Sequence, residues 1–435
     1  MGMNQKHFFP NTPSSHIATL LLVACPPLSL YLSGAGSLLL YALLLLSVVS
    51  FSTSGFTPDA ARPGPAYWRP LLLITVVLFV AIVVAQIAHH KLHASSLEKA
   101  ARIFCIVPLV YFFCKLQARH LRQVQWGFVL ATLGGAWALI FPLAVFVAPD
   151  GSLRPDTASF TLYNTVGFAN LVMLFSTLTL ASLGWVLTPF KRLEMAIKVI
   201  VALIGYYAVL MSQTRTSLLA VPVFLAIAFI ADSRTSWRGK TLLASATLAI
   251  LVVLSSSTIV KERIELARQE SGQCADQPQT DSSVCIRFQL LRAATAMFKE
   301  NPFFGTGDGE RFTQSMHSLA DRGLISRFVA DHWGETHNDL SYVAATYGLV
   351  GLFPFIFAMY GMPAWFFVRH LRQRERACVT ASAMGLIIVL GFLAFGLTEM
   401  MFRSMRTVSI YVALVGLMLA LSAPSHATGE KVVHS

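Results

Sequence analysis

Three polar segments of the sequence combine residue types that can bind phosphate or transfer a proton. The first is Ser-Gln-Thr-Arg-Thr-Ser at 212–217, in which Arg215 lies among hydroxyl groups and the amide of Gln213. A guanidinium presents a planar fork that matches phosphate oxygens, and Thr216 adds a hydroxyl donor beside it. The alternative is an arginine whose charged head only marks the edge of an apolar segment. Because polar groups surround the arginine, the segment favours an anion-binding site.

The second segment begins at Arg287 and reads Arg-Phe-Gln-Leu-Leu-Arg-Ala-Ala-Thr-Ala-Met-Phe. Its apolar spacing predicts an amphipathic helix over 287–299. Arg292 follows Arg287 by five residues, which is about 140° around a helix, so the two side chains cannot share one face. We expect one arginine to serve a site and the other to face solvent.

The third segment is Asp-His-Trp-Gly-Glu-Thr-His-Asn-Asp-Leu at 331–340, which places His337 just before a long apolar run. A neutral imidazole can accept a proton from a hydroxyl group while a neighbour holds its other ring nitrogen. The alternative is a histidine that only makes structural hydrogen bonds at the start of a helix. The candidate orienting partners are Asp331, Glu335, Asn338 and Asp339.

A different cluster, His-His-Lys-Leu-His at 89–93, raises the possibility of a metal site. His89 and His93 have the spacing of two zinc ligands on one helix face, but no glutamate follows as in His-Glu-x-x-His and no third ligand is evident. We therefore interpret the cluster as a polar group at a membrane interface. The sequence predicts no metal and no cofactor.

The elements that must position these segments are membrane helices. Of 435 residues, 55% are hydrophobic and only 12% are charged, whereas a soluble domain has about 25% charged residues. Basic residues exceed acidic ones by 12, but they lie in short groups between apolar runs, which is typical of membrane topology and argues against nucleic-acid binding. The fold class we predict is all-α, a polytopic membrane protein.

About twelve apolar runs are long enough, at roughly 17 to 25 residues, to cross a membrane as helices. The first run follows a polar start and lacks a small-residue cleavage site, so we expect a retained helix and not a signal peptide. The runs are 16–35, 36–52, 70–88, 102–118, 124–147, 166–187, 194–212, 216–231, 240–257, 339–368, 378–398 and 407–423.

The distribution of Lys and Arg predicts that both termini are cytoplasmic, because the alternate segments this arrangement places inside are the more basic ones. The organisation is then residues 1–256 with nine helices, 257–338 as one long periplasmic loop, and 339–435 with three helices and a cytoplasmic tail. The loop is the main hydrophilic region. Besides the helix over 287–299, a helix is expected from Lys261 and an exposed turn region at 271–283.

Two cysteines, Cys274 and Cys285, bracket the turn region of that loop. In an oxidising compartment, a bond between them would close a short loop and add roughly 2 to 3 kcal/mol of stability. We predict this disulfide; the alternative is a pair of free thiols too far apart to bond.

The order of these segments resembles the O-antigen ligase and polymerase superfamily of bacterial envelope glycosyltransferases. The twelve-helix layout with a long outer loop before the tenth helix is also similar to that family. The segments that carry the resemblance are Tyr-Asn-Thr-Val-Gly-Phe-Ala-Asn at 163–170, Ser-Gln-Thr-Arg-Thr-Ser, Arg-Phe-x-Leu-Leu leading to Asn-Pro-x2-Gly-Thr-Gly, His-Asn-Asp-Leu, and Tyr-Gly-Leu-Val-Gly-Leu at 347–352.

The resemblance implies transfer of a glycan from undecaprenyl diphosphate to an acceptor hydroxyl on the periplasmic side of the inner membrane. In the ligases the acceptor is a sugar of the lipid A core. Carried over to this chain, Arg215 and Arg287 would bind the diphosphate and His337 would be the base or would orient the acceptor. The residues expected to contact substrate are Asn170, Asn338, Gln213 and Thr216.

Other functions remain open at this point. Within the superfamily, a polymerase would lengthen the lipid-linked glycan, and a protein O-oligosaccharyltransferase would move it to Ser or Thr. The ligase is favoured because the Arg-Thr-Ser and His-Asn patterns are present and no outer domain follows the last apolar run. A lipid or solute transporter is a different class, but we see no related halves with charged or broken segments at mid-membrane.

Overall fold

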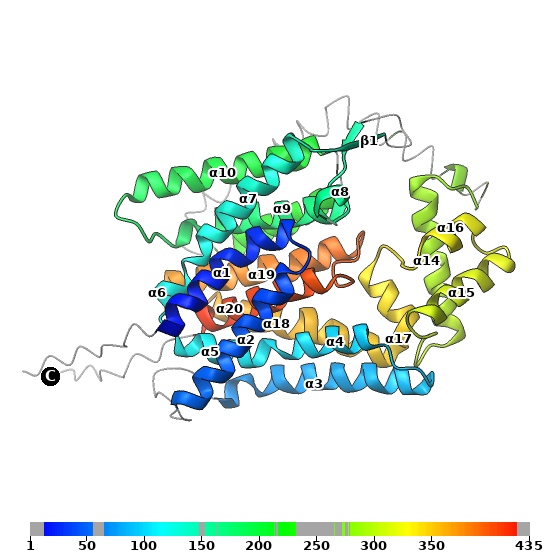
Figure 1. The fold of residues 1–435 in the computed structure, drawn as a ribbon, viewed down its shortest axis with the longest axis horizontal. Coiled ribbons are helices and arrows are strands. Elements are labelled where there is room, and N and C mark those ends of the chain that lie inside the picture. Colours follow the sequence, from blue (N-terminus) through cyan, green and yellow to red (C-terminus); the bar gives the residue numbers. More distant parts are fainter. Residues whose placement is uncertain are drawn as a thin grey trace, which may run out of the picture.

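A computed structural model shows a bundle of long helices with a smaller group of helices at one end (Figure 1). It describes residues 13–54, 65–147, 153–161, 163–212, 214, 216–231, 265, 272–274, 277 and 279–423. The helices are α1 Pro13–Tyr31, α2 Ala35–Ser54, α3 Pro65–Ala88, α4 Ala94–Phe104, α5 Ile106–Lys115, α6 Ala118–Leu121, α7 Val124–Ile140, α8 Ala158–Thr161, α9 Thr165–Ala181, η1 Ser182–Gly184, α10 Lys191–Met211, η2 Thr216–Ala220, α11 Val221–Ala231, α14 Ser283–Glu300, α15 Glu310–Asp321, α16 Arg327–His332, α17 Asp339–Ile356, η3 Phe357–Gly361, α18 Met362–His370, α19 Arg376–Gly396 and α20 Met405–Ser422. Strands β1 Val145–Val147 and β2 Leu153–Pro155 pair antiparallel, with Phe146 opposite Arg154.

The predicted all-α polytopic class is confirmed. Seven helical segments of the described chain are long and apolar enough to cross a membrane, and three shorter apolar helices accompany them. The ninth predicted run, 240–257, lies outside the described residues, as does the helix expected from Lys261. The count of twelve therefore stays a prediction.

Two predicted runs differ from the observed helices because of proline. The run 102–118 is divided between α4 and α5, since Pro108 has no N–H for the carbonyl of Phe104. The run 124–147 ends as a helix at Ile140, before Pro142 disfavours helical backbone at the preceding residue, and continues into β1. After the second break, the chain forms turns and then strand β1, which the apolar pattern alone did not predict.

Helices α14, α15 and α16 form the small group at the end of the bundle, beside the first turns of α17 (Figure 1). The predicted helix over 287–299 is confirmed by α14, whose buried Leu290, Ala294 and Met297 pack with Phe312 of α15 and Val329 of α16. The predicted disulfide is also present, with the Cα atoms of its two cysteines 5.3 Å apart. This bond ties the start of α14 to the segment before it.

The group is also bound to α17 through the backbone. Helix α17 breaks at Gly348, whose φ is +60°, and the loop between α14 and α15 fills the break. The N–H groups of Leu349 and Val350 donate to the carbonyls of Pro302 (2.8 Å) and Phe303 (3.1 Å). In the other direction, the N–H groups of Thr306 and Gly307 donate to the carbonyls of Ala345 (2.8 Å) and Thr346 (3.1 Å). A Cβ at Gly305 or Gly348 would lie 2.4 Å from a backbone atom, so only glycine permits this approach.

Candidate functional site

His337 lies in the short connection between α16 and α17, at the end of the bundle that carries the small helical group. Its backbone φ is +50°, a left-handed conformation that is uncommon for any residue other than glycine. Such strain persists where surrounding contacts enforce it, and it is concentrated at functional sites. The conformation therefore marks His337 as a residue held in place by its neighbours.

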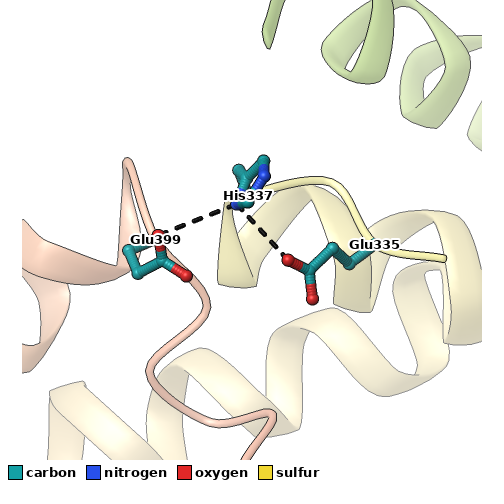
Figure 2. A group of neighbouring side chains, drawn as sticks. All are labelled: Glu335, His337 and Glu399. Carbon is teal, nitrogen blue, oxygen red and sulfur yellow. Dashed lines mark ion pairs between the residues drawn. The ribbon is translucent and has the colours of Figure 1, made fainter. Parts of the chain in front are cut away.

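The two ring nitrogens of His337 have different surroundings. The indole N–H of Trp333 donates to Nε2 at 3.1 Å, so Nε2 is an acceptor. The proton of a neutral ring must then be on Nδ1, by inference from this bond. Nδ1 lies 3.4 Å from Oε1 of Glu335 and 3.7 Å from Oε2 of Glu399, and Figure 2 shows the ring between the two carboxylates.

Glu399 is the functional neighbour that the sequence interpretation missed. It comes from the connection between α19 and α20, and its side chain is only 9% exposed. Asn164, the N-cap of α9, donates from Nδ2 to its Oε1 at 2.9 Å. Burial raises the pKa of Glu399, but its interaction with His337, 3.7 Å away, and the hydrogen bond from Asn164 outweigh burial and hold the pKa below its ordinary value. Glu399 is therefore a carboxylate at neutral pH, and it is fixed on both sides.

Glu335 holds the other side of the ring, and Arg403 forms an ion pair with it. Glu335, His337 and Glu399 offer ligand atoms that all lie within 4.8 Å of one another, which is a spacing that can hold a metal ion. Since a guanidinium already compensates the charge of Glu335, these residues fit an imidazole held between carboxylates without any added cation.

The other predicted orienting partners of His337 bind elsewhere. Asn338 caps α17, since its Oδ1 accepts from the N–H of Ser341 at 2.9 Å and its Nδ2 donates to the carbonyl of Leu397 at 3.0 Å. Asp339 accepts from the backbone N–H groups of Met401 (3.0 Å) and Phe402 (3.1 Å). Asn338 and Asp339 thus fix the α19–α20 connection, and with it Glu399, against the start of α17. Asp331 lies 3.5 Å from His317.

Gln213 and Arg215 lie outside the described residues, but the residues around them connect to the same end of the bundle. Ser217 donates to Oδ1 of Asn170 at 2.7 Å, and Nδ2 of Asn170 lies 3.8 Å from Sδ of Met401. Met401 is two residues from Glu399. Ser217 is therefore joined, through Asn170, to the connection that holds His337. Asn170 is fully buried and acts here as a link between helices.

Thr216 begins η2, and its hydroxyl is buried without a hydrogen-bond partner among the described residues. An unpaired buried hydroxyl is unfavourable, so a donor or acceptor supplied by a ligand would stabilise it. This agrees with the predicted role of Thr216 in binding substrate, which stays a prediction.

Arg287 lies near the start of α14, and its side chain is exposed. Its guanidinium forms no hydrogen bond or ion pair with any other described residue, and therefore none with His337. Arg292 differs, because its Nη1 donates to the carbonyl of Leu324 at 3.4 Å. Of the two arginines, Arg287 is the one available to a ligand.

His89 and His93 lie in the connection between α3 and α4, against the α14–α15 loop. Nε2 of His89 lies 3.2 Å from the carbonyl oxygen of Phe304, and the ring of His93 packs on Gly309. Together with Lys91 and Arg311 they line a small hollow of about 220 Å³. Lys91 pairs with Glu310 and Arg311 lies beside His89, so these residues form polar contacts between elements.

The arrangement of His337 can serve general-base catalysis. A carboxylate at Nδ1 orients the ring and stabilises its protonated form, while Nε2 accepts a proton from a donor. In this structure the indole of Trp333 supplies that donor, so a substrate hydroxyl would take its place.

Replacing Glu399 by glutamine should lower turnover about 10- to 100-fold, because Glu335 remains beside Nδ1 to orient the ring. The amide cannot stabilise a protonated imidazole as a carboxylate does, so the acidic limb of the pH–rate profile should move to lower pH. Measuring that profile for the variant and the wild type tests the assignment. An unchanged profile with a lower rate would mean that Glu399 only supports the fold.

A family model described as O-antigen ligase matches residues 199–357, a segment that contains Arg215, Arg287 and His337. No match to the chain is found among curated proteins.

Proposed function

We propose that the protein transfers an O-antigen glycan from undecaprenyl diphosphate to a sugar hydroxyl of the lipid A core, which completes lipopolysaccharide; the match of residues 199–357 to a family model described as O-antigen ligase supports this. The protein would lie in the bacterial inner membrane, with both termini in the cytoplasm and the end that carries His337 in the periplasm. Its partners are the lipid-linked donor, the core acceptor and membrane lipid.

One observation carries the proposal: within the matched segment, His337 presents Nε2 as an acceptor while carboxylates flank Nδ1. In the reaction, the acceptor hydroxyl gives its proton to Nε2 and its oxygen bonds to the anomeric carbon. The bond from that carbon to the diphosphate breaks, and its electrons leave with the undecaprenyl diphosphate. A single displacement of this kind inverts the configuration at the sugar carbon.

Charge develops on the diphosphate as the glycosidic bond breaks. Arg215 and Arg287 would neutralise it, since guanidinium groups bind phosphate oxygens in a bidentate manner. The lack of any bond from Arg287 to the rest of the described chain supports this role. The buried hydroxyl of Thr216 would add a donor near Arg215.

Reconstitution tests the function directly. Purified full-length protein in liposomes should convert lipid-linked glycan and lipid A core into a ligated product, detected as a mass increase of the core by one glycan chain. Lengthened donor with unmodified core would instead identify a polymerase, and glycan on a Ser- or Thr-containing peptide would identify a protein oligosaccharyltransferase.

Chelation should leave this transfer unchanged. The charge of the leaving diphosphate is assigned to arginines, and the carboxylate of Glu335 is paired with Arg403. The initial rate should therefore be the same with and without EDTA. Loss of activity on chelation, with recovery on adding a divalent cation, would instead assign a metal to Glu335, His337 and Glu399, whose ligand atoms are close enough to share one.

A further inference from the structure

Three aromatic side chains, Phe328, His332 and Trp333, lie in mutual contact along α16 and at its end, and we call them the aromatic group. The ring centroids of Phe328 and His332 are 4.3 Å apart, those of Phe328 and Trp333 are 5.4 Å apart, and those of His332 and Trp333 are 5.9 Å apart. The side chain of Phe328 is 41% exposed, and His332 is exposed as well. Single exposed apolar side chains are ordinary, whereas adjoining ones mark a surface that binds a ligand or a partner.

The packing of α16 holds the aromatic group in one orientation. Phe328 and His332 are one helical turn apart and share a face, and Nδ1 of His332 lies 2.9 Å from the carbonyl oxygen of Phe328. The adjoining face is buried through Val329, which packs with α14 and α15. Ser326, the N-cap of α16, donates from its N–H to Oε1 of the buried Gln289 at 2.6 Å. Rings fixed in this way lose little freedom when a ligand stacks on them.

The aromatic group is joined directly to the candidate base. Nε1 of Trp333 donates to Nε2 of His337 at 3.1 Å. In the proposed reaction the acceptor hydroxyl approaches this same Nε2, and a base has to lie within about 2.6 to 3.2 Å of the group that gives up its proton. The sugar ring that carries the hydroxyl therefore lies beside the indole, within reach of the neighbouring rings of Phe328 and His332.

A pyranose ring offers two kinds of surface to a protein. Its hydroxyl groups lie around the edge, and its C–H groups cover the two faces. The face of an aromatic ring carries partial negative charge and attracts these C–H groups, and stacking also removes their apolar surface from water. An exposed aromatic surface beside the base therefore fits the acceptor sugar, whereas the diphosphate of the donor needs cations and hydrogen-bond donors.

We propose that Phe328, His332 and Trp333 form the acceptor subsite, on which a pyranose ring of the core stacks while its hydroxyl reaches Nε2 of His337. Trp333 then exchanges its hydrogen bond to Nε2 for contact with the sugar. Because stacking uses a C–H face, the subsite selects a pyranose that has at least one face without an axial hydroxyl. That this sugar is the acceptor of a glycan rests on the proposed function, whereas stacking of a pyranose on the aromatic group does not.

Steady-state transfer by the full-length protein in liposomes, with the acceptor varied at saturating donor, tests the proposal. Phe328→Leu should raise KM for the acceptor about 5- to 20-fold, because leucine keeps apolar bulk but has no aromatic face. The lost contact is the same in the ground state and the transition state, so kcat should stay within about twofold. Phe328→Trp should keep KM within about threefold of wild type. The matched control is Phe303→Leu, which removes an exposed ring from the α14–α15 loop and should change neither constant.

A wild-type acceptor KM in Phe328→Leu would overturn the proposal. An equal loss in Phe328→Trp would also overturn it, since Phe328 would then act through packing, and so would an equal loss in Phe303→Leu, which would indicate general contact of exposed rings with the membrane. A rise in KM for the donor in place of the acceptor would assign the aromatic group to the donor glycan and overturn the acceptor subsite.

Binding without transfer separates failure of the subsite from failure of the proposed function. Saturation-transfer NMR with core oligosaccharide freed from lipid A should show magnetisation passing from the full-length protein to sugar C–H protons, and Phe328→Leu should weaken it. This result in a protein that performs no glycan transfer would overturn the proposed function and leave the stacking subsite intact. Signals of equal strength in wild type and Phe328→Leu would overturn the subsite, whatever the rate of transfer.

Discussion

Replacing His337 by alanine is expected to lower glycan transfer by about 10² to 10⁴-fold, the usual contribution of a general base. The variant should still fold, because α17 is capped by Asn338 and not by the imidazole. Initial rates in liposomes measure the effect. In cells, the same variant should leave undecorated lipid A core on a lipopolysaccharide gel.

The control for this variant is His317→Ala. His317 is a partly exposed histidine on α15 whose nearest charged partner is Asp331 at 3.5 Å, so its removal alters neither Nε2 nor the two glutamates at His337. It should transfer glycan at the wild-type rate. If lipopolysaccharide from cells with the His337 variant showed the wild-type ladder of glycan-bearing bands on the gel, the imidazole would be excluded as the base. This holds for any result with the His317 variant.

Replacing Arg287 by glutamine should reduce transfer about 10² to 10³-fold, which is typical when a group that stabilises developing charge is removed. Arg215→Lys should fail to a similar degree, because a point charge cannot replace a bidentate fork. The effect belongs to the bond-breaking step, so kcat should fall along with kcat/KM. Steady-state rates over a range of donor concentrations separate the two constants.

Helix α14 provides a matched control in Arg292→Gln. Both arginines are exposed on the same helix, but Arg292 bonds to the carbonyl of Leu324, whereas Arg287 forms no hydrogen bond or ion pair within the described part of the chain. The Arg292 variant should change the rate by no more than about twofold, as expected of a surface substitution. Equal losses in the two variants would point to the stability of α14 and not to diphosphate binding.

Features set by local pattern could be predicted from the sequence. The apolar spacing after Arg287 predicted helix α14, and the apolar run after His337 predicted helix α17. The two cysteines on either side of a polar turn predicted the disulfide. Each depends on residues close together in the chain, where periodicity and spacing carry the information.

Features set by pairing of distant segments could not be predicted in this way. Glu399 reaches His337 across 62 positions of sequence, and nothing local indicates which carboxylate meets which imidazole. A signal was nevertheless present, since Glu399 directly follows the apolar run 378–398, and an ionisable group at the depth where a membrane helix ends is costly and often functional. The break of α17 at Gly348 was hidden for the same reason, because its partner is the loop after α14.

The loop that fills the break in α17 limits how the outer helices can move. Four backbone hydrogen bonds and two glycines at close approach join the loop to a membrane-crossing segment, so the 301–307 connection cannot act as a hinge. Helices α14 to α16 and the part of α17 around Gly348 must then move together as a rigid unit. At the candidate site, the Trp333 indole that donates to Nε2 of His337 is then a side chain that can swing aside without movement of this loop.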